Sequence, residues 1–171
     1  KDADKAFSWT KKAAEEGNLA AQFNLGMVYL LAKGTQRDDE KAVNWFKKSA
    51  RQGYPKAQRN LGLMYGKGQG VTKDDETALA WFQKAADQGD SESALYLGMM
   101  CFFGQGTPQD SIKSYVWFSV ASSLGSIDAE GCIVDVVNKL TPQELENARA
   151  EAARKIEEIK KRKKAKKSST Q

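Results

Sequence analysis

The amino-acid sequence contains no histidine among its 171 residues. Histidine is the commonest general base, the usual partner of a nucleophilic serine or cysteine, and a frequent zinc ligand. The sequence also lacks an apolar run long enough to cross a lipid bilayer. We therefore expect a protein that is not an enzyme, with no catalytic residue, metal site or cofactor and no small-molecule substrate.

A repeat of 36 residues dominates the sequence instead. All four tryptophans lie on it, as Trp9, Trp45, Trp81 and Trp117. Glycines and aspartates keep the same period, including Gly17, Gly53, Gly89 and Gly125 and Asp2, Asp38, Asp74 and Asp110. Several residue types that keep one period without a slip are the signature of a stacked repeat array.

Each repeat is predicted to be a hairpin of two helices, which we call helix A and helix B. In the repeat at 55–90, Pro55 opens helix A, because a first-turn proline loses no helical hydrogen bond. The glycine-rich segment 66–70 forms the loop, and Asp74 then caps helix B. Gly89 ends helix B in a left-handed conformation that costs glycine little. Neither helix can bury its apolar stripe alone, so the hairpins must stack into an all-α solenoid.

The repeated residues carry a family resemblance. The pattern A-x-x-x-L-G-x-x-Y, then G-x-G-V-x-K-D, then A-x-x-W-F-x-K-A-A-x-Q-G closely resembles the Sel1-like repeat, a relative of the tetratricopeptide repeat. The resemblance covers residues 1 to about 126, with Cys101 in place of a tyrosine, Ala32 in place of a loop glycine and Ser114 in place of an alanine. It implies a right-handed α/α superhelix, in a family whose members assemble or regulate protein complexes, often in bacteria.

We expect a single solenoid domain over residues 1–159. Its predicted parts are an orphan helix B at 1–18, complete repeats at 19–54, 55–90 and 91–126, and capping helices at 127–159. The first residues are in phase with a helix B whose helix A is missing, so either a longer protein is truncated there or an export signal was removed. The absence of a signal therefore does not define the compartment. A bacterial periplasmic, envelope or secreted location is favoured over the cytoplasm.

The chain ends in a strongly basic segment. Thr141-Pro142-Gln143-Glu144 has the pattern of a capping box and opens the last predicted helix. Between Arg154 and Lys167 the net charge is +7, against +5 for the whole chain, so the rest is nearly neutral. Because such runs repel themselves, residues 160–171 are predicted to be a disordered basic tail. This tail can contact an anionic membrane or nucleic acid, or it can serve only to keep the chain in solution.

Two short motifs are typical of catalytic or phosphate-binding sites, but the repeat explains both. Residues 8–11 spell S-x-x-K, which marks the nucleophile of penicillin-recognising enzymes. The first of these positions is Asn44 and Ala80 in later repeats, so it is a variable helix position. The G-x-G segments at 68–70 and 104–106 lie between helices and lack the lysine–serine ending of a P-loop, so we assign them to turns.

The two cysteines are not expected to form a disulfide. Cys132 is in phase with Tyr96, which puts Cys101 and Cys132 five positions apart on neighbouring helices A. That offset is about 7 Å along the axis, added to an interhelical spacing of about 8–10 Å. A disulfide needs Cα atoms roughly 4.4–6.8 Å apart. Free, buried cysteines suit a reducing compartment and are compatible with the periplasm.

A partner-binding surface is predicted on the helices A, which line the concave face in related hairpin solenoids. The predicted residues, which we call the helix-A set, are Phe23, Asn24, Met27, Arg59, Asn60, Leu63, Lys67, Leu95, Tyr96, Met99 and Phe102. Aromatic residues, methionine and arginine are enriched at interface cores. Asn24 and Asn60 can hydrogen-bond the backbone of an extended peptide. The alternative reading is that Phe23, Leu63 and Leu95 simply pack against the next repeat.

The function expected from these features is a non-enzymatic scaffold or adaptor that binds a protein or peptide segment in the concave groove. One alternative is an inhibitor or immunity protein that blocks a bacterial toxin or enzyme. Another is anchoring of the chain to anionic membrane or nucleic acid through the basic tail. The sequence does not identify the partner, because one fold of this kind hosts many.

Overall fold

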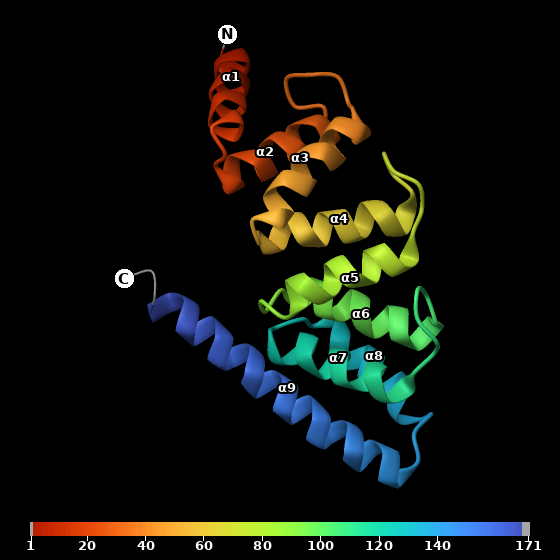
Figure 1. The fold of residues 1–171 in the computed structure, drawn as a ribbon. Coiled ribbons are helices and arrows are strands. Elements are labelled where there is room, and N and C mark those ends of the chain that lie inside the picture. Colours follow the sequence, from red (N-terminus) through yellow and green to blue (C-terminus); the bar gives the residue numbers. More distant parts are fainter. Residues whose placement is uncertain (1, 169–171) are drawn as a thin grey trace. The chain divides into compact units, whose positions relative to one another are not determined.

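The computed structural model describes residues 2–168, and these residues form helices joined by short loops (Figure 1). The helices are α1 (Asp2–Glu15), α2 (Leu19–Leu30), α3 (Asp39–Arg51), α4 (Pro55–Lys67), α5 (Asp75–Ala86), α6 (Ser91–Phe103), α7 (Ser111–Ser123), α8 (Asp128–Val137) and α9 (Pro142–Ser168). The predicted all-α class and the repeated helix hairpins are therefore confirmed. The chain divides into two compact units, one through Trp81 and the other from Phe82. The expectation of a single domain over 1–159 stays a prediction.

The first unit is built around the hairpin of α2 and α3. Helix α1 packs against α2, and α4 packs against α3. Its core consists of Ala42, Val43, Phe46, Ala50, Ala57, Leu61 and Met64. The Phe46 ring is completely buried. This core alternates large and small side chains, as close packing of helices requires.

The second unit is built around the hairpin of α6 and α7. Helices α8 and α9 both pack against α7. Phe118 on α7 and Leu97 on α6 are among its buried residues, together with Val136 of α8 and Ile159 of α9. The unit therefore ends in two helices that pack on the last complete repeat, where the sequence predicts capping helices.

The helix-B starts predicted from the repeated aspartates are confirmed. Asp38, Asp74 and Asp110 each accept a hydrogen bond from the backbone N–H three residues later, at 2.8, 2.9 and 2.9 Å. Their own N–H groups donate to the carbonyls of Tyr29, Tyr65 and Cys101 and so close each loop. Because the tyrosine position contributes its backbone to this bond, the change to Cys101 leaves the loop intact.

Ala32 keeps the turn of the first complete repeat at a cost in stability. It stands where later repeats have Gly68 and Gly104, which both adopt left-handed backbone with φ of 66° and 70°. Ala32 adopts the same conformation, with φ of 54°. For a residue with a Cβ atom this conformation costs about 1–2 kcal/mol.

A glycine on helix A accommodates a phenylalanine ring of helix B. A Cβ atom added to Gly26 would lie 2.6 Å from the ring of Phe46, and one added to Gly98 would lie 2.4 Å from the ring of Phe118. Only the absence of a side chain lets each ring approach the helix backbone so closely. We call this contact the ring seat.

Residues 160–168 of the basic segment are helical, and the disorder that the sequence predicts for 160–171 stays a prediction. These residues continue α9, while 169–171 lie outside the described part of the chain. Two features offset the charge repulsion. Ile159 is only 1% exposed against the rest of the second unit. Asp87 pairs with Lys155 at 2.9 Å, and Arg162 lies 4.0 Å away from the same oxygen.

The start of α9 is the predicted capping box. The backbone N–H of Thr141 donates to the Glu144 carboxylate at 2.8 Å, and the N–H of Glu144 donates to the Thr141 hydroxyl at 3.3 Å. The bond from the Thr141 backbone is the main reason that the pKa of Glu144 lies below its usual value. This reciprocal pair fixes where α9 leaves the preceding turn.

Gly98→Ala is expected to lower the free energy of unfolding by about 1–3 kcal/mol, because the new methyl group would overlap the Phe118 ring. That ring is 2% exposed, so displacing it from the helix would disturb other buried contacts. The control is Gly131→Ala in α8, where nothing lies within 4 Å of the added carbon. It should raise stability by about 0.5–1 kcal/mol. Urea denaturation measures the free energy of unfolding of both variants. A Gly98→Ala variant as stable as the unmodified chain would contradict the ring seat.

Ile159→Ala is expected to destabilise the docked half of α9 by about 2–5 kcal/mol, because it removes the buried side chain that holds this half in place. Hydrogen exchange of residues 155–166 should then speed up, while exchange in α6 changes little. Lys161→Ala, at an exposed position, is the matched control and should leave the exchange unchanged. Fast exchange of these residues in the unmodified chain would show that the segment is disordered after all.

Candidate functional site

The helix-A set falls on three helices in two groups. Phe23, Asn24 and Met27 lie on α2, and Arg59, Asn60, Leu63 and Lys67 lie on α4, all within the first unit. Leu95, Tyr96, Met99 and Phe102 lie on α6 in the second unit. A continuous groove over all eleven residues stays a prediction.

In the first unit several of these residues make internal contacts. The ring of Phe23 lies 5.7 Å from that of Phe46 and 5.3 Å from that of Tyr54. Asn60 donates from Nδ2 to the sulfur of Met27 at 3.5 Å. The alternative reading of Phe23 as a packing residue therefore has direct contacts in its favour.

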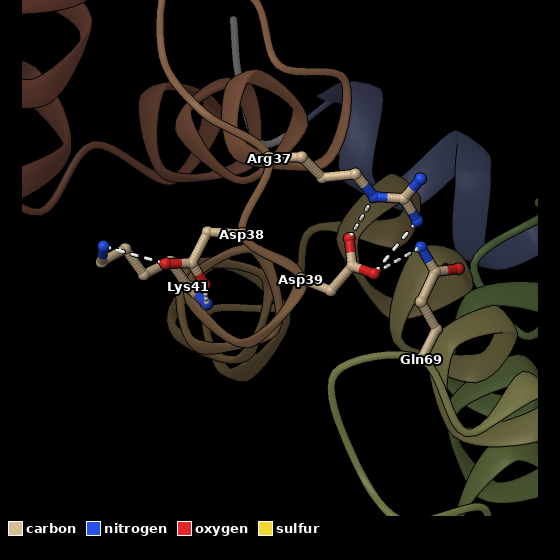
Figure 2. A network of polar contacts seen from close by, with 5 residues as sticks. All are labelled: Arg37, Asp38, Asp39, Lys41 and Gln69. Carbon is tan, nitrogen blue, oxygen red and sulfur yellow. Dashed lines mark hydrogen bonds and ion pairs between the residues drawn. The ribbon is translucent and has the colours of Figure 1, made fainter.

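A polar network links two loops of the first unit (Figure 2). The Asp39 carboxylate accepts from Nε and Nη2 of Arg37, at 2.9 and 3.0 Å, and from Nε2 of Gln69 at 3.2 Å. The hydrogen bond from Arg37 is the main reason that the pKa of Asp39 is lowered. Gly70 is required beside this network, because a Cβ atom there would lie 2.5 Å from the Asp39 backbone. The network therefore holds consecutive loops together.

In the second unit Tyr96 fills a slot beside a helix-B ring. Its ring stacks on that of Phe82 with 4.9 Å between the centroids and 23° between the planes. Cys132 of α8 stands 36 positions after Tyr96, and Phe118 stands 36 after Phe82. The cysteine is too small to stack on a ring as Tyr96 does, and Phe118 is instead buried by other neighbours, at 2% exposed.

A hollow of about 180 Å³ lies at that place between α6, α7 and α8. It is lined by Met99, Phe102, Phe103, Phe118, Cys132 and Asp135. We call it the Cys132 slot. The sequence predicts Met99 and Phe102 as binding residues, and the structure places both in this hollow. Phe103 is 66% exposed at its edge, a high value for a large apolar side chain.

Four residues of the slot were not predicted from the sequence: Phe103, Phe118, Cys132 and Asp135. One signal could have found them. The column Asn24, Asn60, Tyr96 and Cys132 occupies the same position in successive helices A and ends in its smallest member. A loss of side-chain volume at one repeated position predicts a hollow at that repeat.

The charge around the slot is negative. Helix α8 carries Asp128, Glu130 and Asp135 and no basic residue. Lys139, just after α8, lies with its ammonium nitrogen 4.0 Å from the centre of the Phe102 ring. Partial burial, followed by the charges of Asp135 and Asp128, raises the pKa of the Cys132 thiol. The thiol is therefore a poor nucleophile at neutral pH.

The rest of the chemistry is equally sparse. Both cysteines are free, and burial raises the pKa of the Cys101 thiol as well. Within residues 2–168 no three metal-ligating side chains come together. None of the helices that the structure describes has the length and apolar character to span a membrane.

Asp135→Asn is expected to lower the pKa of the Cys132 thiol, because it removes an anion that disfavours the thiolate. At a fixed pH below that pKa, iodoacetamide should react faster at Cys132, and the pH profile of the rate should move to lower pH. Mass spectrometry of the digested protein follows Cys132 and the buried Cys101 separately, so Cys101 serves as the internal control. An unchanged profile would mean that burial alone sets this pKa.

One family model matches the chain. The model of the Sel1 repeat matches residues 1–18, 19–54, 55–90 and 91–126, the four segments predicted above. No curated protein matches the chain.

Several solved structures are similar to the chain, among them the following three. A protective antigen of uropathogenic Escherichia coli strains with an SLR fold is 34% identical, with a TM-score of 0.86 over 98% of this chain. This chain spans only 36% of that protein. A Sel1 repeat protein from Oxalobacter formigenes is 31% identical, with a TM-score of 0.70, over 77% of this chain and 98% of its own length. Cysteine-rich protein B of Helicobacter pylori is 27% identical, with a TM-score of 0.60, over 76% and 93%.

The repeat period, the hairpins and the ring seat all recur within the matched segments, which make up most of the chain. The Sel1 repeat is a protein-interaction repeat, and its members are generally not catalytic. On this evidence the chain belongs to the Sel1 repeat family.

Proposed function

We propose that this chain is a non-enzymatic adaptor that binds a protein or peptide segment on its helices A. The observation that carries the proposal is the Cys132 slot, an apolar hollow of about 180 Å³ beside an exposed phenylalanine. Two members of the helix-A set, Met99 and Phe102, line it. The family, whose repeats serve protein interaction, supports the same conclusion.

The size and lining of the slot favour a side chain of a larger partner over a free small molecule. Small-molecule sites usually enclose about 300–1,000 Å³ and contain several convergent polar groups. The slot is smaller, and Asp135 is the one charged side chain in its lining. Burying one apolar side chain there would contribute about 1.5–3 kcal/mol, enough to anchor a longer segment that makes further contacts.

Anchoring through the basic segment is the competing function. In the structure this segment is the end of helix α9. Lys160, Lys161 and Lys164 are exposed on the last turns of α9. These cations can attract a polyanion, with an affinity that falls steeply as salt rises. The adaptor is preferred because the slot offers burial of apolar surface as well as charge.

A photo-crosslinking amino acid placed at Phe103 is expected to capture one protein in the native cell, and the same protein should be captured from Asn24 if the helix-A set forms one groove. Lys161 and Arg149, two exposed positions of α9, are the comparison sites. Identification of the crosslinked protein by mass spectrometry is the measurement. Capture from Lys161 but not from Phe103 would support anchoring through α9 and would contradict the adaptor proposal.

A further inference from the structure

The repeat itself shows what kind of group fits the Cys132 slot. In the preceding repeat the corresponding position is Tyr96, whose ring stacks on the helix-B phenylalanine Phe82. In the slot the corresponding pair is Cys132 and Phe118, which line the same hollow. Cys132 therefore leaves the volume of a tyrosine ring unfilled, while Phe118, at 2% exposed, supplies only a small part of the wall of the hollow.

The remaining lining also suits an aromatic ring. Met99, Phe102 and Phe103 supply apolar and aromatic surface from α6. Phe102 and Phe103 meet edge to face, with 5.1 Å between centroids and 89° between planes. Methionine sulfur and ring edges both make favourable contacts with aromatic rings. A partner ring would meet such groups on several sides.

The charge at the slot indicates what lies beside that ring in the partner. Asp135 is part of the lining, and Asp128 and Glu130 stand on the same helix with no basic residue among them. Lys139 is already engaged with the face of Phe102. An acidic partner would be repelled by α8, whereas a lysine or arginine would find a carboxylate at the edge of the hollow.

We propose that the Cys132 slot receives an aromatic side chain from a partner protein segment that carries lysine or arginine next to that ring. This inference rests on the proposed adaptor function and adds the chemistry of the partner. The ring takes the place that Tyr96 takes in the preceding repeat, and the neighbouring cation pairs with Asp135.

Two variants of one residue test the slot. Cys132→Tyr should fill the hollow from within, as Tyr96 does in the preceding repeat, and should leave the melting temperature unchanged or raise it. Cys132→Ser keeps the hollow open and is the matched control. We expect Cys132→Tyr to weaken binding of an aromatic-anchored peptide about tenfold or more, and Cys132→Ser to weaken it less than about twofold.

The probe is a random peptide library displayed on phage and selected on the full chain. Enriched peptides should contain a phenylalanine, tyrosine or tryptophan beside lysine or arginine, and their affinities are then measured by calorimetry. Asp135→Asn should weaken them about two- to fivefold, and more at low salt than at high salt. Glu146→Gln, an exposed acid on α9, is the charge control.

The outcomes separate this inference from the proposed function. Enriched peptides that lack aromatic or basic residues, or that bind Cys132→Tyr as well as the unmodified chain, overturn the inference. If those peptides instead lose affinity for a double variant with Asn24→Ala and Lys67→Ala, the adaptor proposal stands and only the inference about the Cys132 slot is wrong. If neither change affects any selected peptide, both proposals are wrong. Should Cys132→Tyr fail to fold, Phe103→Asp, which puts a charge at the exposed edge of the slot, replaces it.

Discussion

The hairpins depend on the ring seat, in which a phenylalanine of helix B lies on the bare backbone of a helix-A glycine. Phe46 on Gly26 and Phe118 on Gly98 leave no room for even one methyl group between ring and helix. Glycine inside a helix costs about 1 kcal/mol relative to alanine. Burial of a whole phenylalanine ring stabilises the fold by about 1.5–3 kcal/mol, which is more than the glycine costs. The ring reaches its glycine only if helix B starts at a fixed point, which the capping aspartates ensure.

The last repeat departs from this arrangement, and the candidate site arises from that departure. Val134 of α8 stands where Gly98 stands one repeat earlier, and it is 62% exposed. Cys132 likewise stands where Tyr96 stacks on a ring. Helix α8 is therefore built like a helix A but lacks both the seat and the covering ring. A repeat that its neighbour does not cover keeps apolar surface exposed, and the candidate site lies at this repeat.

The basic end of the chain shows how neighbouring groups change the behaviour of a charge run. Taken alone, closely spaced lysines repel one another and favour an extended, solvated chain. In the structure Ile159 is buried, and the carboxylate of Asp87 lies between Lys155 and Arg162. Lys166 also donates to Gln88 in the same turn after α5. Apolar burial and a few well-placed acceptors thus keep this part of α9 helical.

Helix starts and turns could be predicted because they depend on interactions between residues that are close in sequence. Helix starts at Asp38 and Asp110, the capping box at Thr141 and the turn at Gly104 depend on residues within a few positions of one another. The 36-residue period then reports the hairpin directly. Contacts such as Asn60 to Met27 and Phe23 to Tyr54 cross between helices and were not predicted.

The amino-acid sequence by itself determined the all-α class, the 36-residue period, the helix starts that Asp38, Asp74, Asp110 and Thr141 cap, and the lack of histidine. Only the tertiary structure decided that α9 continues as a helix over its basic residues and that Phe103, Phe118, Cys132 and Asp135 surround one hollow. The physical reason is that a hollow is space that no side chain fills. The small Cys132 in the repeated column indicates where a side chain is missing, but whether a hollow remains there depends on how three helices pack and on the volumes of all the side chains between them.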